Sequence, residues 1–410
     1  MLSAIFFETL KRCSVENLVV AKLPAKLAGV SASKKIWLFG AGKAAASMAR
    51  GVLHVCGARV VGGAIIIPSD TERGLENLEQ VQVLRGTHPR PSSVSVAATE
   101  ALIKQIENCH SQEHAVFALS GGASALLCHP SDGLSVETKA DISDALMAAG
   151  APISEINTVR KHLSSVKGGQ LGPHFKCPVT VLVLSDVASN SIENVGSGPL
   201  ALDSTTRADA EKILQRRLKQ NMNELIETPK KSSEFESAIE HVVVGTGFDL
   251  AKTAASVASE YGFSEIFCEP RAVEEEVGSV ADFYAQFVRA YDKQRPLLLI
   301  RYGEPTVVMG HASGQGGRNQ HLALLLAKEL QGISGWQFLA AGSDGIDGNT
   351  TSAGAVVDGQ SWLQAVNNGV DVENSLNGFE SHAVHKSLKS LINSGPTGNN
   401  LQDLHLLILR

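Results

Sequence analysis

A glycine-rich turn that ends in a lysine is the first segment with the residue types to bind a phosphate group. Gly40, Gly42 and Lys43 follow the apolar residues 36–39 and precede a run of small residues that predicts a helix to about residue 55. A helix N-terminus presents backbone N–H groups and a partial positive charge, and glycine lets an anion approach the backbone closely. Lys43 would add a full charge beside that anion. A tight turn with an exposed lysine is the alternative interpretation.

The same turn carries weaker signals for other nucleotide chemistry. The spacing of a Walker A loop is missing, and Ala44 stands where such a loop has the Ser or Thr that binds magnesium. The GxGxxA pattern of dinucleotide-binding folds is present, with Ala45 in its last place. That fold also needs an acid about 20 positions on for the ribose, and the first acid after this turn is Asp70. An NAD(P)-dependent dehydrogenase is therefore the weaker alternative.

A second turn of the same kind follows the apolar residues 115–119. Ser120, Gly121, Gly122 and Ser124 combine two glycines with two hydroxyls at the predicted start of a helix. Hydroxyl and backbone N–H donors at such a position could bind a phosphate or a carboxylate. Two turns of this kind in one domain favour an anion site more than one does, although a serine N-cap with closely packed glycines would give the same pattern.

Arg160 and Lys167 are candidates for binding an anionic substrate. Residues 156–167 are predicted to be helical, and a spacing of seven residues puts the two cations on one face of that helix. Paired cations on one face could hold a carboxylate or a phosphate. A solvated basic face is the alternative.

Three aspartates follow predicted strands and could bind magnesium. Asp186 comes after the fully apolar residues 179–184, and Asp344 and Asp347 stand three apart in a glycine-rich loop after residues 337–341. Magnesium in proteins takes one or two carboxylates together with phosphate oxygens and water. Asp186 could instead bind a substrate hydroxyl, and each of the three could simply cap a turn.

Two further loops offer donors for an anion. Arg318 ends a glycine-rich loop and begins a predicted helix. Its guanidinium could present two parallel N–H donors to a carboxylate or to a transferring phosphoryl group. Thr397, Gly398 and Asn399 form a hydroxyl- and amide-rich loop before the last predicted strand, and we expect this loop to bind substrate or phosphate. The accumulation of such loops at strand ends favours a site over a set of ordinary turns.

The elements that would position these residues alternate between strand, glycine-rich turn and helix. The mostly polar residues 221–233 are the best candidate for a linker, so we predict two α/β domains, residues 1–232 and residues 233–410. Ligands of open α/β sheets bind outside the carboxyl ends of the strands. We therefore expect ligands to bind between the two domains.

Composition argues against several classes of function. The chain has 410 residues and a formal net charge of −6, without a basic block, so nucleic acid and anionic membranes are not expected partners. No stretch approaches the roughly 18–20 apolar residues of a membrane span, and the first 20 residues predict an amphipathic helix rather than a signal peptide. The six cysteines lie far apart without a CxxC pair, which predicts reduced thiols in a cytoplasmic protein.

Taken together and in this order, the motifs resemble one family, the class II glycerate kinases, which are glycerate 2-kinases with a C-terminal MOFRL domain. The matching segments are residues 40–48, 86–91, 120–127, 157–169, 184–199, 303–306, 316–320, 341–358 and 394–403. The resemblance implies two different α/β domains, the first with a Rossmann-like parallel sheet and the second with a mixed sheet, and an active site in the cleft between them. It also implies that ATP and Mg²⁺ are used to phosphorylate D-glycerate, giving 2-phosphoglycerate.

The resemblance further implies roles for single residues. Lys43 and Arg318 occupy the positions of the expected catalytic pair. Asp186 falls in the matching segment 184–199 and is the third expected catalytic residue. Glu304 lies in another matching segment and is expected to contact substrate or phosphate. The expected partners are D-glycerate and a nucleotide, and the expected assembly is a monomer or a homodimer.

Three places depart from the family pattern. Residues 188–191 read Ala-Ser-Asn-Ser where the family usually has Pro-Gly-Asp-Asp, so two acids are missing close to Asp186. His321 replaces a usual glutamate, and Tyr302 replaces a usual glycine. The missing acids leave open a family member that binds its ligands but catalyses weakly.

Overall fold

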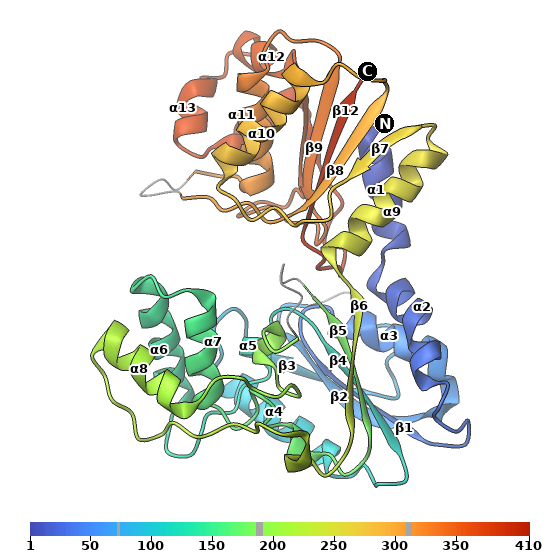
Figure 1. The fold of residues 1–410 in the computed structure, drawn as a ribbon, viewed down its shortest axis with the longest axis vertical. Coiled ribbons are helices and arrows are strands. Elements are labelled where there is room, and N and C mark those ends of the chain that lie inside the picture. Colours follow the sequence, from blue (N-terminus) through green and yellow to red (C-terminus); the bar gives the residue numbers. More distant parts are fainter. Residues whose placement is uncertain (72–73, 186–191, 309–313) are drawn as a thin grey trace. The chain divides into compact units, whose positions relative to one another are not determined.

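The computed structural model describes residues 1–71, 74–185, 192–308 and 314–410, and the chain forms two compact units (Figure 1). One unit contains Val15–Val244, and the other joins Met1–Ser14 to Gly245–Arg410. Each unit is built around its own six-stranded sheet. The predicted fold class of two different α/β domains is therefore confirmed.

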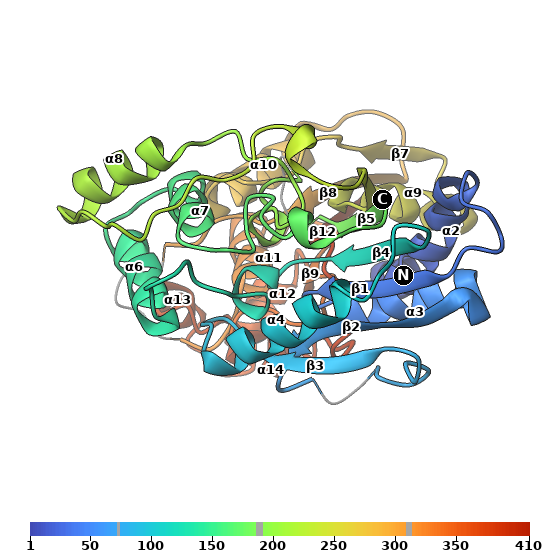
Figure 2. The ribbon, with the colours of Figure 1, turned by 90° about the horizontal axis from the view of Figure 1, so that it is seen from below.

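The sheet of the first unit has the strand order β3-β2-β1-β4-β5-β6. Its strands are β1 (Ile36–Ala41), β2 (Val60–Pro68), β3 (Gln82–Gly86), β4 (His114–Leu119), β5 (Val179–Leu184) and β6 (Ile239–Gly245). The neighbouring pairs from β3 to β5 run parallel, as the two views of the ribbon show (Figures 1 and 2). This is the strand order of the doubly wound dinucleotide-binding fold, and it confirms the predicted Rossmann-like sheet.

Strand β6 extends this sheet past the predicted linker. The strand follows residues 221–233 in the chain and takes the edge position next to β5. The first compact unit therefore ends at Val244, beyond the predicted division after residue 232. A linker of polar composition can return to the sheet that it left, and composition alone does not show this.

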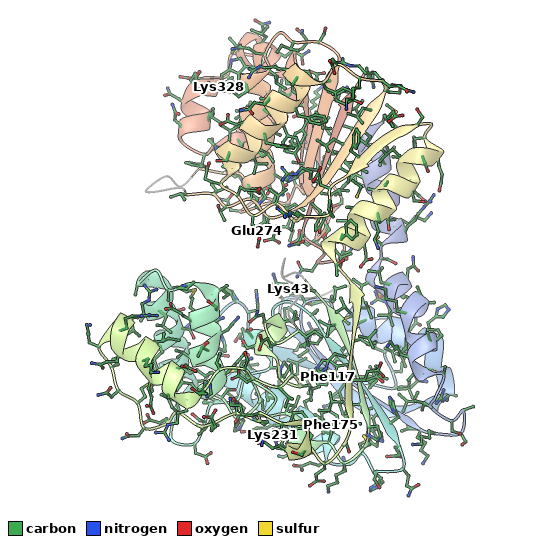
Figure 3. The ribbon with its side chains drawn as sticks, in the orientation of Figure 1. Lys43, Phe117, Phe175, Lys231, Glu274 and Lys328 are labelled. Carbon is green, nitrogen blue, oxygen red and sulfur yellow. A yellow bond between two sulfur atoms is a disulfide. The ribbon has the colours of Figure 1, made fainter. Side chains whose placement is uncertain are left out.

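Aromatic and branched side chains fill the core of the first unit. The rings of Phe39 and Phe117 each form a T-shaped pair with the ring of Phe175, with centroids 5.8 and 6.5 Å apart; Phe117 and Phe175 are labelled in Figure 3. All three side chains are fully buried. Helices α2 (Val15–Leu27), α3 (Ala45–Cys56) and α4 (Ser93–Ile106) belong to the same unit. These contacts fix the strands whose carboxyl ends carry the two glycine-rich turns.

A smaller group of helices in this unit has its own apolar cluster. It consists of α6 (Val136–Ala148), α7 (Ile153–His162) and α8 (Arg207–Leu218). Leu146, Val159 and Leu214 are buried together between them. This cluster holds α6 and α7 in place beside the sheet, and both helices supply cations to the site described below.

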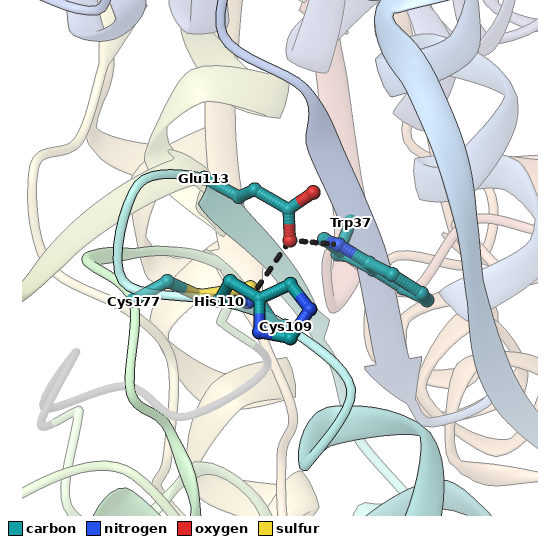
Figure 4. The surroundings of a disulfide bond; sticks show 5 residues. All are labelled: Trp37, Cys109, His110, Glu113 and Cys177. Atoms are coloured by element: carbon teal, nitrogen blue, oxygen red, sulfur yellow. Dashed lines mark hydrogen bonds between the residues drawn. A yellow bond between two sulfur atoms is a disulfide. The ribbon is translucent and has the colours of Figure 1, made fainter.

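A disulfide joins Cys109 to Cys177, which contradicts the expectation that all six cysteines are reduced (Figure 4). Cys109 precedes β4 and Cys177 precedes β5, and these neighbouring strands are parallel, so their amino ends lie at the same edge of the sheet. The two Cα atoms are 6.3 Å apart, although 68 residues separate the cysteines in sequence. Nearby, the carboxylate of Glu113 accepts hydrogen bonds from the Trp37 indole at 2.8 Å and the His110 amide at 2.9 Å. Sequence spacing missed the pair because the sheet, not the chain, brings the cysteines together.

The second unit has a mixed sheet, as predicted, in the order β11-β10-β9-β12-β8-β7. Its strands are β7 (Glu265–Cys268), β8 (Leu297–Gly303), β9 (Trp336–Gly342), β10 (Gly354–Asp358), β11 (Leu391–Ile392) and β12 (Asp403–Leu409). Strands β7 and β8 are parallel, while β12 runs antiparallel to both β8 and β9. The C-terminal strand therefore lies inside its sheet, and every residue of β12 is buried.

The helices of the second unit include one from the N-terminus. They are α1 (Leu2–Arg12), α9 (Gly247–Glu260), α10 (Val277–Ala290), α11 (Arg318–Glu329), α12 (Ser361–Asn367), α13 (Val372–Asn377) and α14 (Ser381–Leu388). Residues 1–20 are not one helix as predicted, because α1 ends at Arg12 and α2 begins at Val15. Arg12 binds Glu260 of α9 through both terminal guanidinium nitrogens, at 2.5 and 2.7 Å. Among the described helices, none is both long and apolar enough to cross a membrane.

Candidate active site

The two glycine-rich turns of the first unit lie at the carboxyl ends of β1 and β4, where the strand order reverses. The backbone N–H of Lys43 donates to Gly121 O at 2.9 Å, and that of Ala44 donates to Ser120 Oγ at 3.1 Å. Gly42 has a φ of +135°, and a Cβ there would lie 2.1 Å from Ser120 Oγ. The turns therefore pack directly against each other, and the contact requires glycine at position 42.

Because the two turns pack together, several of the predicted phosphate-binding residues form hydrogen bonds or close contacts within the protein itself. Gly40 is part of β1, and the amides that follow Gly42 already have acceptors in the second turn. The helix after Gly122 is α5 (Ala123–Leu126), which is only four residues long. So short a helix adds little dipole. A phosphate-binding role for Gly40, Gly42, Ser120 and Gly121 stays a prediction.

The side chain of Lys43 is exposed and lies against the second turn (Figure 3). A Cβ at Gly122, whose φ is +84°, would come within 3.1 Å of Lys43 Cγ and 3.3 Å of His88 Cδ2. Burial lowers the pKa of His88, and the charge of Lys43 acts in the same direction. Glycine at position 122 thus leaves room for a lysine and an imidazole at the edge of a pocket.

That pocket, which we call the cationic pocket, has a volume of about 410 Å³ and lies wholly within the first unit. Its lining includes His88, Gly122, Ser124, Lys139, Arg160 and Lys167. Four of the predicted binding residues, Gly122, Ser124, Arg160 and Lys167, therefore meet in one cavity. Ser124 Oγ also contacts Ser197 Oγ at 3.1 Å.

Lys167 reaches the pocket by a different route from the one predicted. Helix α7 ends at His162, so Arg160 and Lys167 do not share a helix face. Leu163 closes the helix, and the chain then turns so that the Lys167 ammonium donates to Leu127 O at 3.0 Å and to Gly196 O at 3.3 Å. Its side chain is 1% exposed. Burial lowers the pKa of Lys167 to about 7, and the charges of Lys139 and Arg160 act in the same direction.

Lys139 lines the pocket as well, and the sequence analysis missed it. It lies on α6 and is 4% exposed, and burial lowers its pKa to about 8. A signal was present, because Lys139 falls on the buried stripe of α6 with Val136, Ala140 and Leu146. A lysine on the apolar face of an amphipathic helix is uncommon unless something pairs with it.

Arg318, in the second unit, begins α11 and is held by two carboxylates. Its Nε and Nη2 donate to Asp403 at 2.5 and 3.2 Å, and its Nη1 lies 2.9 Å from Glu304. Burial acts to lower the pKa of Arg318, but Asp403 and Glu304 outweigh it, so the net pKa is raised and the guanidinium stays charged. These contacts use three of its five N–H donors. Glu304, predicted to bind substrate, here fixes the arginine.

The predicted metal ligands differ in what they do. Asp347 is 2% exposed, and its carboxylate accepts hydrogen bonds from the backbone and side-chain N–H groups of Asn319 and Gln320 at 2.9–3.2 Å. Asp347 therefore caps the N-terminus of α11 and does not fit a metal-ligand role. Asp344 is half-buried and accepts from the Ile346 amide at 3.0 Å, which is compatible with a ligand to magnesium. Asp186 lies outside the described residues.

In the parts of the chain that the structure describes, no three or more His, Cys, Asp or Glu side chains form a cluster that could hold a metal. A magnesium ion that arrives with a nucleotide needs only one or two protein carboxylates.

The loop before β12 has internal partners of its own. Thr397 Oγ1 donates to Ser343 O at 2.6 Å, and Asn399 Nδ2 donates to Cys13 O at 3.0 Å. Gly398 has a φ of +68° between them. Asn399 thus ties the loop to the N-terminal segment of the same unit, and a substrate-binding role for Thr397, Gly398 and Asn399 stays a prediction.

Comparison with known proteins places this geometry in a family. Residues 1–229 match the domain of unknown function DUF4147, and residues 297–403 match the MOFRL family. The chain is 34% identical to D-glycerate 2-kinase of Thermotoga maritima over 90% of this chain and 89% of that protein. It is 30% identical to glycerate 2-kinase of Pyrococcus horikoshii over 92% and 87%. The crystal structure of a Thermotoga maritima glycerate kinase matches with a TM-score of 0.89 and 30% identity, covering 100% of this chain and 98% of that one.

The Rossmann-like unit, the mixed-sheet unit and these relatives define a kinase built from two α/β units. The chain belongs to the glycerate kinase family that combines a DUF4147 region with a MOFRL domain, so the resemblance to class II glycerate kinases is confirmed.

Proposed function

We propose that the protein transfers the γ-phosphoryl group of ATP, with Mg²⁺, to D-glycerate and forms 2-phosphoglycerate. The observation that carries this proposal is the cationic pocket beside Lys43, where Arg160 and Lys167 line a cavity next to an exposed ammonium. A small hydroxy acid needs such a place for its carboxylate and a second cation near its hydroxyl. The names of the relatives support the same acceptor.

In this proposal the pocket orients the acceptor. Arg160 and Lys167 bind the carboxylate of glycerate, and Ser124 donates to it or to the neighbouring hydroxyl. The hydroxyl that is phosphorylated then points toward Lys43, which lies over Gly122 at the edge of the pocket. Fixing the reacting groups in this way replaces a bimolecular encounter by an oriented one, which is a main source of rate enhancement in such reactions.

Lys43 and Arg318 neutralise the phosphoryl group during transfer. Phosphoryl transfer proceeds through a loose transition state whose negative charge is spread over three oxygens, so positioned cations lower its free energy. Arg318 is pre-oriented by Asp403 and Glu304. Magnesium, when bound, would screen the nucleotide phosphates, with Asp344 and Asp186 as the proposed carboxylate ligands.

The test is an assay of ADP release from Mg-ATP with D-glycerate, with the position of the product phosphate read by phosphorus NMR. We expect ADP release that depends on both D-glycerate and Mg²⁺, and a phosphate on carbon 2. The alternative of an NAD(P)-dependent dehydrogenase is, in particular, a hydroxypyruvate reductase. NAD(P)H oxidation at 340 nm with hydroxypyruvate, without ADP release, would establish that alternative instead. Binding of glycerate and nucleotide without turnover would identify a ligand-binding family member.

We further propose that the enzyme acts in the cytoplasm as a monomer or homodimer on small molecules alone.

A further inference from the structure

The cationic pocket contains more positive charge than a monocarboxylic acid can neutralise. Lys139, Arg160 and Lys167 all line it. Among its described lining residues the one acid is Asp144, and that carboxylate already forms an ion pair with Arg90. Below the lowered pKa values of Lys167 and Lys139, about 7 and about 8, the remaining charge is that of three cations, whereas D-glycerate carries a single negative charge.

Among the residues that the structure describes, Lys139 has no hydrogen-bond partner for its buried ammonium group. Lys167 differs, because two backbone carbonyls accept from its ammonium. Arg160 also differs, because its Nε donates to Ser143 Oγ at 3.3 Å. Burying a charge without a partner costs free energy. An anionic ligand would therefore lower the free energy of the pocket most by pairing with Lys139.

The shape of the pocket leaves room for a second anionic group. Its volume of about 410 Å³ is well above what a three-carbon acid fills. The apolar lining residues are Pro89, Pro91, Ala125, Ala140 and Met147. They offer no polar partner, so a compact anionic ligand depends on the polar and charged residues of the lining, the three cations among them.

We infer that the cationic pocket is a site for hydroxy acids that carry two anionic groups, with Lys139 as the residue that recognises the second group. This inference deepens the proposed function, since it concerns the acceptor pocket of the same reaction. The second group is either another carboxylate on the acceptor or a phosphate on the product. In both cases it takes the place of the partner that Lys139 lacks.

The experiment measures binding by calorimetry without nucleotide. Three probes are used: D-glycerate with one anionic group, tartronate with two carboxylates, and 2-phosphoglycerate with a carboxylate and a phosphate. We expect at least one of the two doubly anionic probes to bind at least tenfold more tightly than D-glycerate. Tight binding of tartronate identifies a carboxylate as the second group, and tight binding of 2-phosphoglycerate alone identifies a phosphate.

Variants of Lys139 then test the residue itself. Lys139→Met should remove most of the advantage of the doubly anionic probe and change D-glycerate binding less than threefold, while Lys139→Arg should keep the advantage. Lys104→Met, at an exposed lysine of α4 in the same unit, is the matched control and should change none of the three affinities. Thermal unfolding shows whether Lys139→Met is folded; its melting temperature should equal or exceed that of the parent, since an unpaired buried charge is removed.

Equal affinity for all three probes would overturn the inference. So would a Lys139→Met variant that weakens all three by the same factor, because Lys139 would then bind the carboxylate that they share. Since no turnover is measured, a protein that binds the doubly anionic probes but releases no ADP would sustain this inference and overturn the proposed function.

Discussion

Single residues in the cationic pocket show how burial changes what a lysine can do. Lys43 is exposed, whereas Lys139 and Lys167 are almost entirely buried in the same unit. Residue type alone predicts three similar cations. The fold alone shows that Lys43 is free to move toward a phosphate, whereas Lys139 and Lys167 are held in the wall of the pocket.

Binding of acidic ligands to the pocket is predicted to weaken with rising pH. Burial lowers the pKa of Lys167 to about 7 and that of Lys139 to about 8. Arg160 and the Cys128 thiol are the other ionisable groups whose charges act on both lysines. Above these values both amines become neutral, so D-glycerate should bind more weakly at pH 9 than at pH 6. Calorimetry from pH 6 to 9 checks this, and a constant affinity would contradict it.

The same two lysines should make the unliganded protein more stable as the pH rises. In the unfolded chain both have the ordinary lysine pKa near 10.5, so between about pH 7 and that value the unfolded state binds more protons than the folded state. Their contribution to the free energy of unfolding therefore increases with pH across that window, while ligand affinity decreases. Opposite trends in these two measurements would distinguish the buried lysines from surface groups.

At the scale of elements, the bounds of β5 could be predicted from the sequence, while the end of α7 could not. The apolar residues 179–184 predict β5 with its observed bounds. The sequence predicts one helix over residues 156–167, but α7 ends at His162. Beyond that point the chain leaves the helix, and the buried Lys167 ammonium donates hydrogen bonds to two backbone carbonyl groups. That interaction is tertiary and leaves no trace in helical periodicity.

The capping of α11 gives a prediction that separates structure from metal binding. Asp347→Ala should lower the free energy of unfolding by at least about 2 kcal/mol, because it leaves four N–H donors of Asn319 and Gln320 without their acceptor in a buried place. Asp344→Ala should cost much less stability, since its bond to the Ile346 amide is exposed. Urea unfolding measures both changes. Equal losses in the two variants would show that the cap is not what Asp347 supplies.

The disulfide predicts a redox-dependent stability of the first sheet. Cross-linking two cysteines 68 residues apart should stabilise the folded chain by roughly 4 kcal/mol through the entropy of the unfolded state. Reduction by dithiothreitol should therefore lower the melting temperature, and Cys109→Ser should do so without the reagent. Cys56→Ser, at a buried cysteine that forms no disulfide, is the control. A melting temperature that reduction leaves unchanged would show that the pair does not form in solution.

At the scale of the whole molecule, the sequence predicts two α/β units but not how the chain divides between them. The alternation of strands and helices is local, so it can be followed along the chain. The addition of β6 to the first sheet and of α1 to the second unit depends on long-range pairing. Long-range hydrogen bonds, such as that from Asn399 to the backbone oxygen of Cys13, hold the N-terminal segment in the second unit. Nothing in the sequence around either residue predicts that bond.

The proposed catalytic roles of Lys43 and Arg318 predict a specific pattern of kinetic effects. Lys43→Ala should lower kcat by about 10²–10³-fold, since it removes one positioned charge. Arg318→Lys keeps a charge beside the buried carboxylate of Asp403 but loses the planar guanidinium that donates two hydrogen bonds to it. This variant should also lower kcat. If the two cations act on the transition state as one coupled unit, the double variant should lose less than the product of the single losses.

Ligand binding supplies the control for this cycle. The cations of the pocket all belong to the unit Val15–Val244, so D-glycerate affinity should change less than threefold in both single variants. Lys35→Ala, at an exposed lysine just before the opposite end of β1, should leave both kcat and affinity unchanged. Losses that simply multiply in the double variant would mean that Lys43 and Arg318 stabilise the transition state independently of each other and not as a coupled pair, because independent contributions to a free energy of activation add.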